Sequence, residues 1–369
     1  MSVEVKCSVC GRISRKVLDF RCSYCRNPLD IKVLGNFDTA RINEHNFSLW
    51  RYARFFPYIN EADIITLGEG WTPLVRFSQN IFFKLENLNP TGSFKDRGST
   101  TLISALNRTV KETGSFIAED SSGNAGASVA AYAGRAGLKA RIYVPEAVAG
   151  PKFQQIQSYA AEVVKVPGAR SLVAEDAQKP EPGKLYIGHI LHPLFRDGIR
   201  TLAYEIAEQS DWRSPDRVYV PVSAGTLLLG VIEGFFHMFR SKVITKMPTI
   251  VACQTRQVSP LFNRIKNQPY TPPAVLNSVA DALVSIKPPF LELMVKKLRE
   301  ANGDTTVTEE AEIINSFEEL AKNGFLVEPS SAVAYAALKK QRDEGIVSSK
   351  DRVVVVLTGS GLKTTFGLH

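Results

Sequence analysis

The chain has 369 residues, of which 44% are hydrophobic and 22% charged, and its formal net charge is +8. This length exceeds one ordinary domain, and the composition is typical of a soluble globular protein. No apolar stretch reaches the roughly 18 residues of a membrane span, and the opening MSVEVKCSVC lacks the apolar core of a signal peptide. We therefore expect a cytoplasmic protein without a membrane partner.

Four of the five cysteines lie within the first 25 residues, as two pairs that eleven residues separate: Cys7 with Cys10, and Cys22 with Cys25. Each pair can place two thiolates on one tetrahedral metal ion, which suits zinc. Four thiolates leave no open position for a catalytic water, so the pattern predicts a structural zinc-ribbon-like segment over residues 1–34. The alternative is a degenerate ribbon whose cysteines pair with one another or stay free.

Beyond about residue 35, short β-branched runs alternate with helical segments. Strands are expected at residues 80–87, 114–120, 138–146, 161–168, 184–190, 216–225, 249–254 and 352–359. Helices are expected at residues 99–110, 125–136, 152–161, 198–209, 227–239, 290–299, 308–323 and 330–341. Continuous apolar strands such as VVVVL (353–357) indicate burial on both faces, as in parallel sheets covered by helices. The alternation predicts an α/β fold.

Four loops that follow expected strands are rich in glycine and serine. They are NPTGSFKDRGS (89–99), DSSGNAG (120–126), PVSAGTLLLG (221–230) and LTGSGLK (357–363). Ligands of α/β sheets bind beyond the carboxyl ends of the strands, where small residues before a helix leave N–H groups open to a phosphate. Neither an ATP P-loop nor the usual NAD fingerprint occurs. A lysine, Lys95, beside such a phosphate site indicates pyridoxal phosphate, whose aldehyde condenses with an amine.

Together with EPSSA (328–332), these motifs resemble those of the fold-type II pyridoxal-phosphate enzymes, which include tryptophan synthase β, cysteine synthase, serine/threonine dehydratases and threonine synthases. Within this family, the segments that look most like those of threonine synthases are LGEGWTPL (67–74), FRDGIRTLAYEI (195–206), EPSSAVAYAAL (328–338) and VVVVLTGSGLK (353–363). The resemblance implies two three-layer α/β domains with the active site between them, beside the zinc-ribbon-like segment. The expected boundaries are residues 35–104 and 205–369 for a large cofactor-binding domain, and 105–204 for a smaller, mobile domain.

The resemblance also implies a role for each matching residue at the cofactor. Lys95 would form the Schiff base with pyridoxal phosphate and later move protons at the substrate carbons. Asn124 would hydrogen-bond the 3′-oxygen of the ring, and Thr358 would face the pyridine nitrogen, with Ser330 as its competitor. The residues expected around the cofactor phosphate are Ser223, Ala224, Gly225, Thr226 and Leu227.

The substrate residues follow from the same resemblance. Ser121 and Ser122 would hold the substrate carboxylate, although capping of the following helix is an equally natural role for them. Arg196 is the candidate for a substrate phosphate, because a guanidinium matches phosphate oxygens. Its alternative is a surface ion pair with Asp197 or Glu205.

In threonine synthases the substrate is O-phosphohomoserine, which loses phosphate from the γ-carbon and gains water at the β-carbon. The expected partner is thus a small phosphorylated amino acid, and the family leads us to expect a homodimer. Three segments depart from that enzyme's common pattern: GHILHPLFR (188–196), with one extra residue, SAGTL (223–227) and LTGSGLKTT (357–365).

Two alternatives remain open. The first keeps the cofactor and changes the reaction to β-elimination or β-replacement, as in serine/threonine dehydratase or a phosphoserine-using cysteine or cysteate synthase. The second is a basic zinc-ribbon protein that binds nucleic acid and has a non-catalytic body. Basic residues are scattered, with no run longer than two, so the sequence does not favour a nucleic-acid partner.

Overall fold

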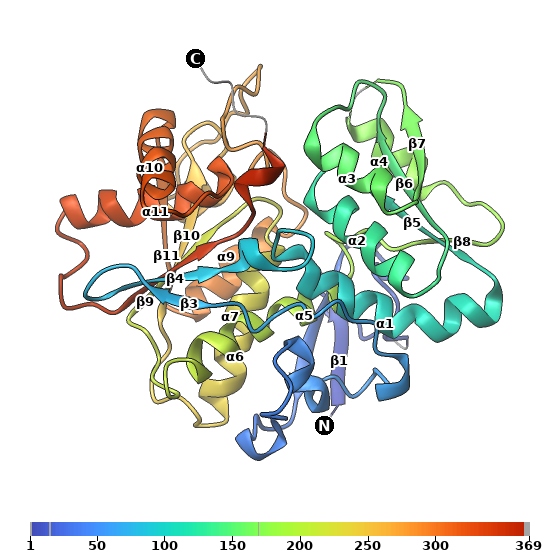
Figure 1. Ribbon diagram of the computed structural model, residues 1–369, viewed down its shortest axis with the longest axis horizontal. Helices are drawn as coiled ribbons and strands as arrows, with labels where there is room; N and C mark the ends of the chain where they lie inside the picture. Colours follow the sequence, from blue (N-terminus) through green and yellow to red (C-terminus); the bar gives the residue numbers. More distant parts are fainter. Residues whose placement is uncertain (1, 15, 169, 365–369) are drawn as a thin grey trace.

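The computed structural model describes residues 2–14, 16–168 and 170–364, and Figure 1 shows two sheets, each accompanied by helices, with the N-terminal strands below them. The larger sheet has the strand order β11-β10-β9-β12-β4-β3. Its strands are β3 (Leu74–Arg76), β4 (Ile81–Leu85), β9 (Arg217–Pro221), β10 (Thr249–Thr255), β11 (Asp304–Thr308) and β12 (Val353–Leu357). All neighbours in it pair in parallel except β3, which runs antiparallel to β4.

The smaller sheet is parallel throughout and has the order β7-β6-β5-β8. Its strands are β5 (Phe116–Asp120), β6 (Ala140–Pro145), β7 (Glu162–Val166) and β8 (Lys184–Tyr186). A separate antiparallel pair joins β1 (Ser2–Cys7) to β2 (Leu29–Leu34). The mixed sequence of strands and helices thus folds as two parallel-sheet units, which confirms the predicted α/β class.

The helices divide between the two sheets. Helices that accompany the smaller sheet are α2 (Asn124–Arg135), α3 (Pro151–Ser158) and α4 (Arg170–Gln178). Those of the larger sheet are α6 (Thr201–Glu208), α7 (Thr226–Arg240), α8 (Pro260–Ile265), α9 (Leu291–Glu300), α10 (Glu310–Lys322) and α11 (Pro329–Asp343). Short 3₁₀ turns are η1 (Thr39–Arg41), η2 (Leu49–Phe55), η3 (Glu61–Asp63), η4 (Glu86–Leu88) and η5 (Gly361–Lys363).

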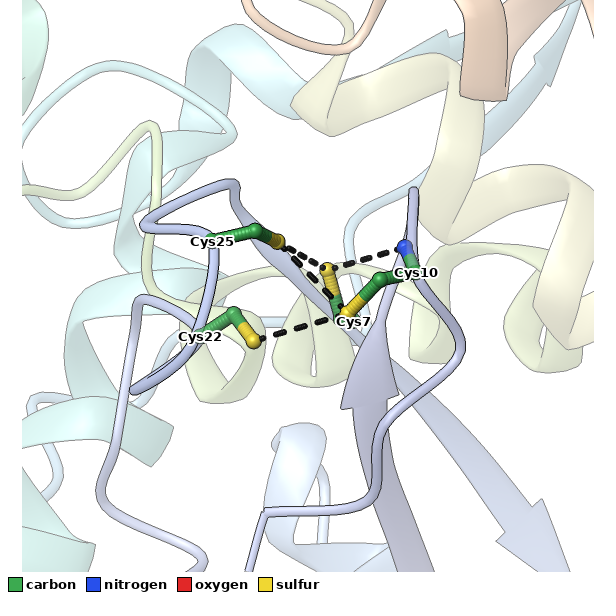
Figure 2. Close-up of side chains that lie close together, drawn as sticks. All are labelled: Cys7, Cys10, Cys22 and Cys25. Carbon is green, nitrogen blue, oxygen red and sulfur yellow. Dashed lines mark hydrogen bonds between the residues drawn. The ribbon is translucent and has the colours of Figure 1, made fainter.

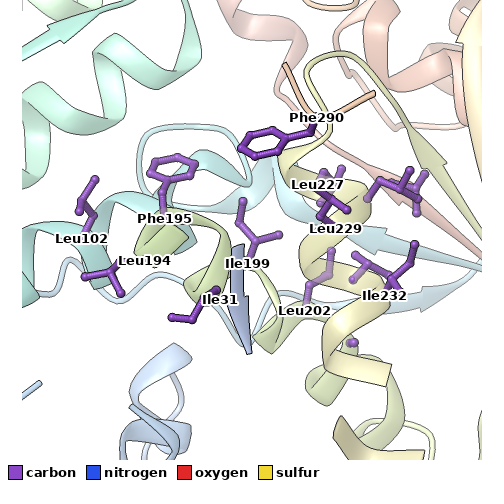
Figure 3. Close-up of a cluster of buried hydrophobic side chains, with 14 of the residues drawn as sticks. Ile31, Leu102, Leu194, Phe195, Ile199, Leu202, Leu227, Leu229, Ile232 and Phe290 are labelled. Carbon is purple, nitrogen blue, oxygen red and sulfur yellow. The ribbon is translucent and has the colours of Figure 1, made fainter. Parts of the chain in front are cut away.

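Helices α1 (Lys95–Thr113) and α5 (Pro193–Ile199) connect the two units and pack against each other. Two glycines permit this close approach: a Cβ on Gly198 would lie 2.1 Å from the carbonyl oxygen of Arg97, and one on Gly98 would lie 2.4 Å from the Phe195 ring. Figure 3 shows α5 contributing Leu194, Phe195 and Ile199 to a buried cluster that includes Leu102 of α1 and Leu227 of α7. The hydrophobic core is therefore continuous between the units.

In strand β12 the apolar run VVVVL predicts a strand that is buried on both faces. Its five residues are fully buried, and it lies between β9 and β4 in the larger sheet. A β-branched run with no polar residue suits such a position, because helices cover both faces of a parallel sheet.

Two boundaries differ from the sequence-based expectation. Helix α1 begins at Lys95 and not at Ser99, and the helix expected at 198–209 is two helices, α5 and α6, which meet at Arg200. The first turn of α1 was missed because Asp96 and Arg97 are charged yet buried, so the apolar period does not reveal it. Within the described residues, every helix is too short or too polar to cross a membrane.

Candidate active site

Lys95 is the first residue of α1, and its loop is tied to the loop that follows β12. The Phe94 N–H donates to the Thr358 carbonyl (3.0 Å), and the Ser360 N–H donates to the Gly92 carbonyl (2.9 Å). The Lys95 Nζ lies 4.6 Å from the centre of the Phe94 ring and 5.8 Å from that of Phe195. The amine is therefore placed at the carboxyl edge of the larger sheet, between two aromatic side chains.

Asp96 anchors the start of α1 on one side. Its carboxylate accepts hydrogen bonds from the Thr91 N–H (2.7 Å) and from the Ser128 hydroxyl (2.6 Å) of α2. Burial raises the pKa of Asp96 to about 6, and the hydrogen bonds from Ser128 and Thr91 oppose this shift. The aspartate thereby joins the lysine loop to a helix of the smaller sheet.

Arg97 anchors α1 on the other side, within a buried group of four charges. Its guanidinium binds Glu86 (2.6 Å) and Glu205 (2.6 Å), and Glu205 also binds Lys84 (2.8 Å); all four side chains are 0% exposed. The two positive and two negative charges cancel, as a buried group requires. Asp96 and Arg97, which directly follow Lys95, are thus both buried and held by side chains of the protein interior.

Asn124 opens α2 in the loop after β5. Its Nδ2 donates to both carboxylate oxygens of Glu328 (3.1 and 2.9 Å), a residue that sequence reasoning did not single out. In the same loop, the Ser121 hydroxyl accepts from the Gly123 N–H (3.3 Å). Among the described residues no side chain caps α2, so its first N–H groups remain available to a carboxylate.

Residues 223–227 form the loop between β9 and α7 and the first turn of that helix. Gly225 precedes the helix with φ +101°, and a Cβ there would lie 2.5 Å from the Met294 sulfur. Within the described chain no side chain caps α7 either. Open N–H groups and the positive end of the helix dipole make this loop suited to a phosphate.

Thr358 directly follows β12, and its hydroxyl lies 2.9 Å from that of Ser331. The competitor considered for this position, Ser330, instead accepts from the Ala282 N–H (3.1 Å). The neighbour of Thr358 is therefore Ser331. The sequence EPSSA offers two adjacent serines, and only the direction of α11 decides which one turns inward.

Arg196 is 3% exposed and is not gathered with the residues around Lys95. Its Nη2 donates to the Leu29 carbonyl (2.5 Å) and lies 3.6 Å from Asp30, both in the N-terminal segment. Burial lowers its pKa, and the charge of Asp30 opposes this. The surface ion pair considered as the alternative is absent from the contacts of the described residues. The α5 side chain beside Lys95 is Phe195.

The residues around Lys95 fit pyridoxal phosphate on the structure's own terms. The Ser93 hydroxyl and the Asn124 Oδ1 are buried without a hydrogen-bond partner among the described residues. Buried polar atoms in folded proteins are normally satisfied, so both groups have hydrogen-bonding capacity that a bound ligand can take up. A lysine amine, a phosphate loop and two orphaned polar atoms, in loops that follow strands of the two sheets, match a phosphorylated aldehyde.

Comparison with known proteins decides the family. The pyridoxal-phosphate-dependent enzyme family matches residues 65–359 of this chain, which is most of its length. The chain belongs to this family. The expectation of a pyridoxal-phosphate-dependent enzyme is thereby confirmed.

Relatives of this pyridoxal-phosphate-dependent enzyme include several threonine synthases. The chain is 31% identical to the threonine synthase of Methanocaldococcus jannaschii over 339 residues, which cover 88% of this chain and 82% of the relative. It is 28% identical to the threonine synthase of Methanosarcina acetivorans over 386 residues, which cover 98% of this chain and 92% of the relative. It is 33% identical to the threonine synthase of a Synechocystis species over 325 residues, which cover 85% of this chain and 82% of the relative.

Solved structures share the fold of this pyridoxal-phosphate-dependent enzyme. Threonine deaminase isoform 2 from Solanum lycopersicum superposes with a TM-score of 0.68 at 19% identity, covering 90% of this chain and 87% of that one. Maize serine racemase gives a TM-score of 0.63 at 24% identity, covering 78% and 84%. At these identities the likeness concerns the fold alone.

The four N-terminal cysteines form a second candidate site in the enzyme. Figure 2 shows that their side chains converge from two loops. Their sulfur atoms all lie within 4.8 Å of one another, and the Cys7–Cys25 and Cys10–Cys22 distances are 3.4 and 3.7 Å. Tetrahedral zinc with bonds of about 2.3 Å places thiolate sulfurs roughly 3.8 Å apart. The cluster therefore fits one zinc ion with all four positions filled by protein.

Proposed function

We propose that this enzyme is a threonine synthase, which converts O-phosphohomoserine and water to threonine and phosphate. The observation that carries the proposal is the similarity to threonine synthases along nearly the whole chain, including the N-terminal segment in the Methanosarcina acetivorans protein. The candidate site is consistent with it, because a lysine amine and an open helix N-terminus lie at one sheet edge.

Pyridoxal phosphate, when bound, supplies an electron sink for carbanions formed on the substrate. We assign Lys95 to hold the cofactor and to move protons at the substrate carbons. Asn124 would orient the ring through its 3′-oxygen, and Thr358, held by Ser331, would place a neutral hydroxyl at the pyridine nitrogen. Residues 223–227 would bind the cofactor phosphate.

Substrate binding is assigned separately. Ser121 and Ser122 would hold the substrate carboxylate together with the open N–H groups of α2. The role of Arg196 with the substrate phosphate stays a prediction, and its present partners, Leu29 and Asp30, favour a structural role.

One observation favours a second candidate function. The α5 side chain recorded beside the Lys95 amine is the apolar ring of Phe195, whereas the Arg196 guanidinium contacts Leu29 and Asp30. That surrounding suits a smaller substrate without a γ-phosphate, so a β-eliminating or β-replacing enzyme of the same family is the alternative. It would use the same lysine and the same cofactor residues.

The two functions are separated by incubating the holoenzyme with O-phosphohomoserine, O-phosphoserine and threonine. We expect phosphate and threonine from O-phosphohomoserine alone, with the Lys95→Ala variant inactive on all three. Phosphate release from O-phosphoserine only, or a ketoacid from threonine, would replace the proposal with the second candidate.

We also propose that Cys7, Cys10, Cys22 and Cys25 bind a structural zinc ion. Metal analysis of the purified chain should find about one zinc per chain, because four thiolates complete one tetrahedral site. A Cys7→Ser/Cys22→Ser variant should lose it. Metal-free wild-type protein prepared without chelators would show a degenerate ribbon instead.

Residues 105–204 are proposed as a smaller domain that moves against residues 35–104 and 205–369. All strands of the smaller sheet lie between Phe116 and Tyr186, which supports this division. A cytoplasmic homodimer is the proposed form of the enzyme. Light scattering of purified protein would contradict the dimer if the mass were that of one 40.7 kDa chain.

A further inference from the structure

The carboxylate of Glu328 lies at the point where loops of the two sheet units meet. The residue directly precedes α11, is 1% exposed, and its backbone N–H donates to the Gly359 carbonyl (2.9 Å). A Cβ on Gly359 would lie 2.1 Å from the Glu328 Oε2, so any other residue at 359 would displace the carboxylate. The Glu328 backbone is therefore held by Gly359, and the missing side chain of Gly359 leaves room for the Glu328 carboxylate.

Glu328 binds two side chains at once. Asn124 donates to it from α2 (2.9 Å to Oε2), and Lys152 binds it from α3 (2.9 Å to Oε1). Lys152 also binds Asp281 (2.8 Å). Burial lowers the pKa of Lys152, but the charges of Glu328 and Asp281 outweigh this and raise the pKa above its ordinary value, so the lysine is charged.

These contacts join the two units across the candidate site. Asn124 and Lys152 belong to helices of the smaller sheet, whereas Glu328 belongs to the larger one. A second contact runs beside them, from the Gln155 Nε2 of α3 to the Thr91 carbonyl (3.1 Å) in the lysine loop. Helix α3 is thus held over the loop that carries Lys95.

The Asn124 amide has two N–H donors and one carbonyl acceptor. Both Glu328 oxygens lie within hydrogen-bond distance of its nitrogen, and this fixes which end of the amide is which. Its Oδ1 has no partner in the described part of the chain. One N–H and the carbonyl are therefore left in a set orientation for a ligand.

We propose that Glu328 is a positioning residue of the cofactor site, which orients the Asn124 amide toward the cofactor and holds α3 closed through Lys152. One carboxylate would thus couple closure of the smaller unit to the geometry of the cofactor ring. The proposal rests on the proposed role of Asn124 at the 3′-oxygen. Glu328 itself touches neither substrate nor cofactor in this assignment.

The test titrates pyridoxal phosphate into apoprotein of wild type and Glu328→Gln, and records the visible absorption band. Loss of a positioning partner typically weakens binding by roughly 10- to 100-fold. We expect Glu328→Gln to bind pyridoxal phosphate that much more weakly and to shift the absorption maximum. The matched control is Glu319→Gln, which removes a glutamate bonded to Lys339 and Tyr335 away from the site and should behave as wild type.

Hydrogen exchange tests the closure through α3. The backbone amides of residues 152–158 in α3 should exchange faster in both Lys152→Met and Glu328→Gln, while only Glu328→Gln shifts the absorption maximum. A merely structural glutamate would lower the melting temperature without moving that band.

The inference is overturned if Glu328→Gln keeps the wild-type absorption maximum and an affinity within about two-fold of wild type. If Glu328→Gln does not fold, Lys152→Met decides, and wild-type exchange in α3 would overturn the inference. A wild-type protein that shows no visible band refutes the cofactor assignment itself, which is a separate outcome.

Discussion

Replacing Arg97 by methionine tests whether the buried charges hold the start of α1. The four side chains of the group are 0% exposed and carry two positive and two negative charges. Arg97→Met leaves a net negative charge in the interior, and breaking a buried pair in this way costs about 3–5 kcal/mol in the free energy of unfolding. That is a large share of the roughly 5–15 kcal/mol that stabilises a typical folded protein.

The measurement is urea unfolding followed by fluorescence and by circular dichroism, with coincident transitions required before a free energy is derived. The matched control is Arg108→Met on the same helix, which removes an exposed ion pair with Asp63 and should cost less than about 1 kcal/mol. A double variant, Arg97→Met/Glu86→Gln, removes one charge of each sign.

The double variant should recover at least about 1 kcal/mol relative to Arg97→Met, because interaction energies between contacting charges are of this size. The reasoning is refuted if Arg97→Met costs no more than Arg108→Met. It is also refuted if adding Glu86→Gln only makes the protein less stable, since the lost contacts and not the unpaired charge would then dominate.

Three further predictions concern the site and its supports. Gly225→Ala forces a side chain into a positive-φ conformation that costs about 1–2 kcal/mol, and titration should show pyridoxal phosphate binding weakened by roughly ten-fold; unchanged affinity would contradict the phosphate assignment of this loop. Burial alone would raise the pKa of Glu205, but the charges of Arg97 and Lys84 lower it to about 2, so its stabilising contribution is complete above the unfolded value of 4.5. Urea unfolding should show that contribution disappearing as the pH falls from 4.5 toward 2, with a shallower loss in Glu205→Gln. Arg196→Met should speed amide exchange in β2 and leave the KM for O-phosphohomoserine unchanged; a raised KM with normal exchange would make Arg196 a substrate ligand.

The sequence predicted the parallel-sheet architecture because its signals are local. Runs such as VVVVL and loops such as SSGNAG announce a buried strand and a helix start without reference to the rest of the chain. The loops containing Lys95, Asn124 and Thr358 were each expected beyond the carboxyl end of a strand. One hydrogen bond, from the Phe94 N–H to the Thr358 carbonyl, joins the first loop to the last, and Asn124 follows β5 of the smaller sheet. The roles of Lys95, Asn124 and Thr358 at the cofactor are tested by the substrate comparison and by the cofactor titrations.

Other features could not be read from the sequence because they depend on contacts distant along the chain. Glu328 lies 204 positions from Asn124, and nothing in EPSSA shows that its glutamate turns toward that amide. Helix α1 was begun four residues late because a charged first turn looks solvent-exposed until its partners are known. Strand β11 (DTTVT) was missed because its threonines and aspartate give only a weak apolar signal.

The order of two neighbouring residues on α5 decides which of them lies beside the lysine amine. Successive residues of a helix point about 100° apart, so Phe195 faces the lysine amine while Arg196 turns to the N-terminal segment. Removing one residue from the loop before Pro193 would advance the helix by one position and bring the guanidinium to the place of the ring. We therefore expect the length of this loop to decide which α5 side chain lies beside the lysine amine, with the residues of the four glycine- and serine-rich loops unchanged.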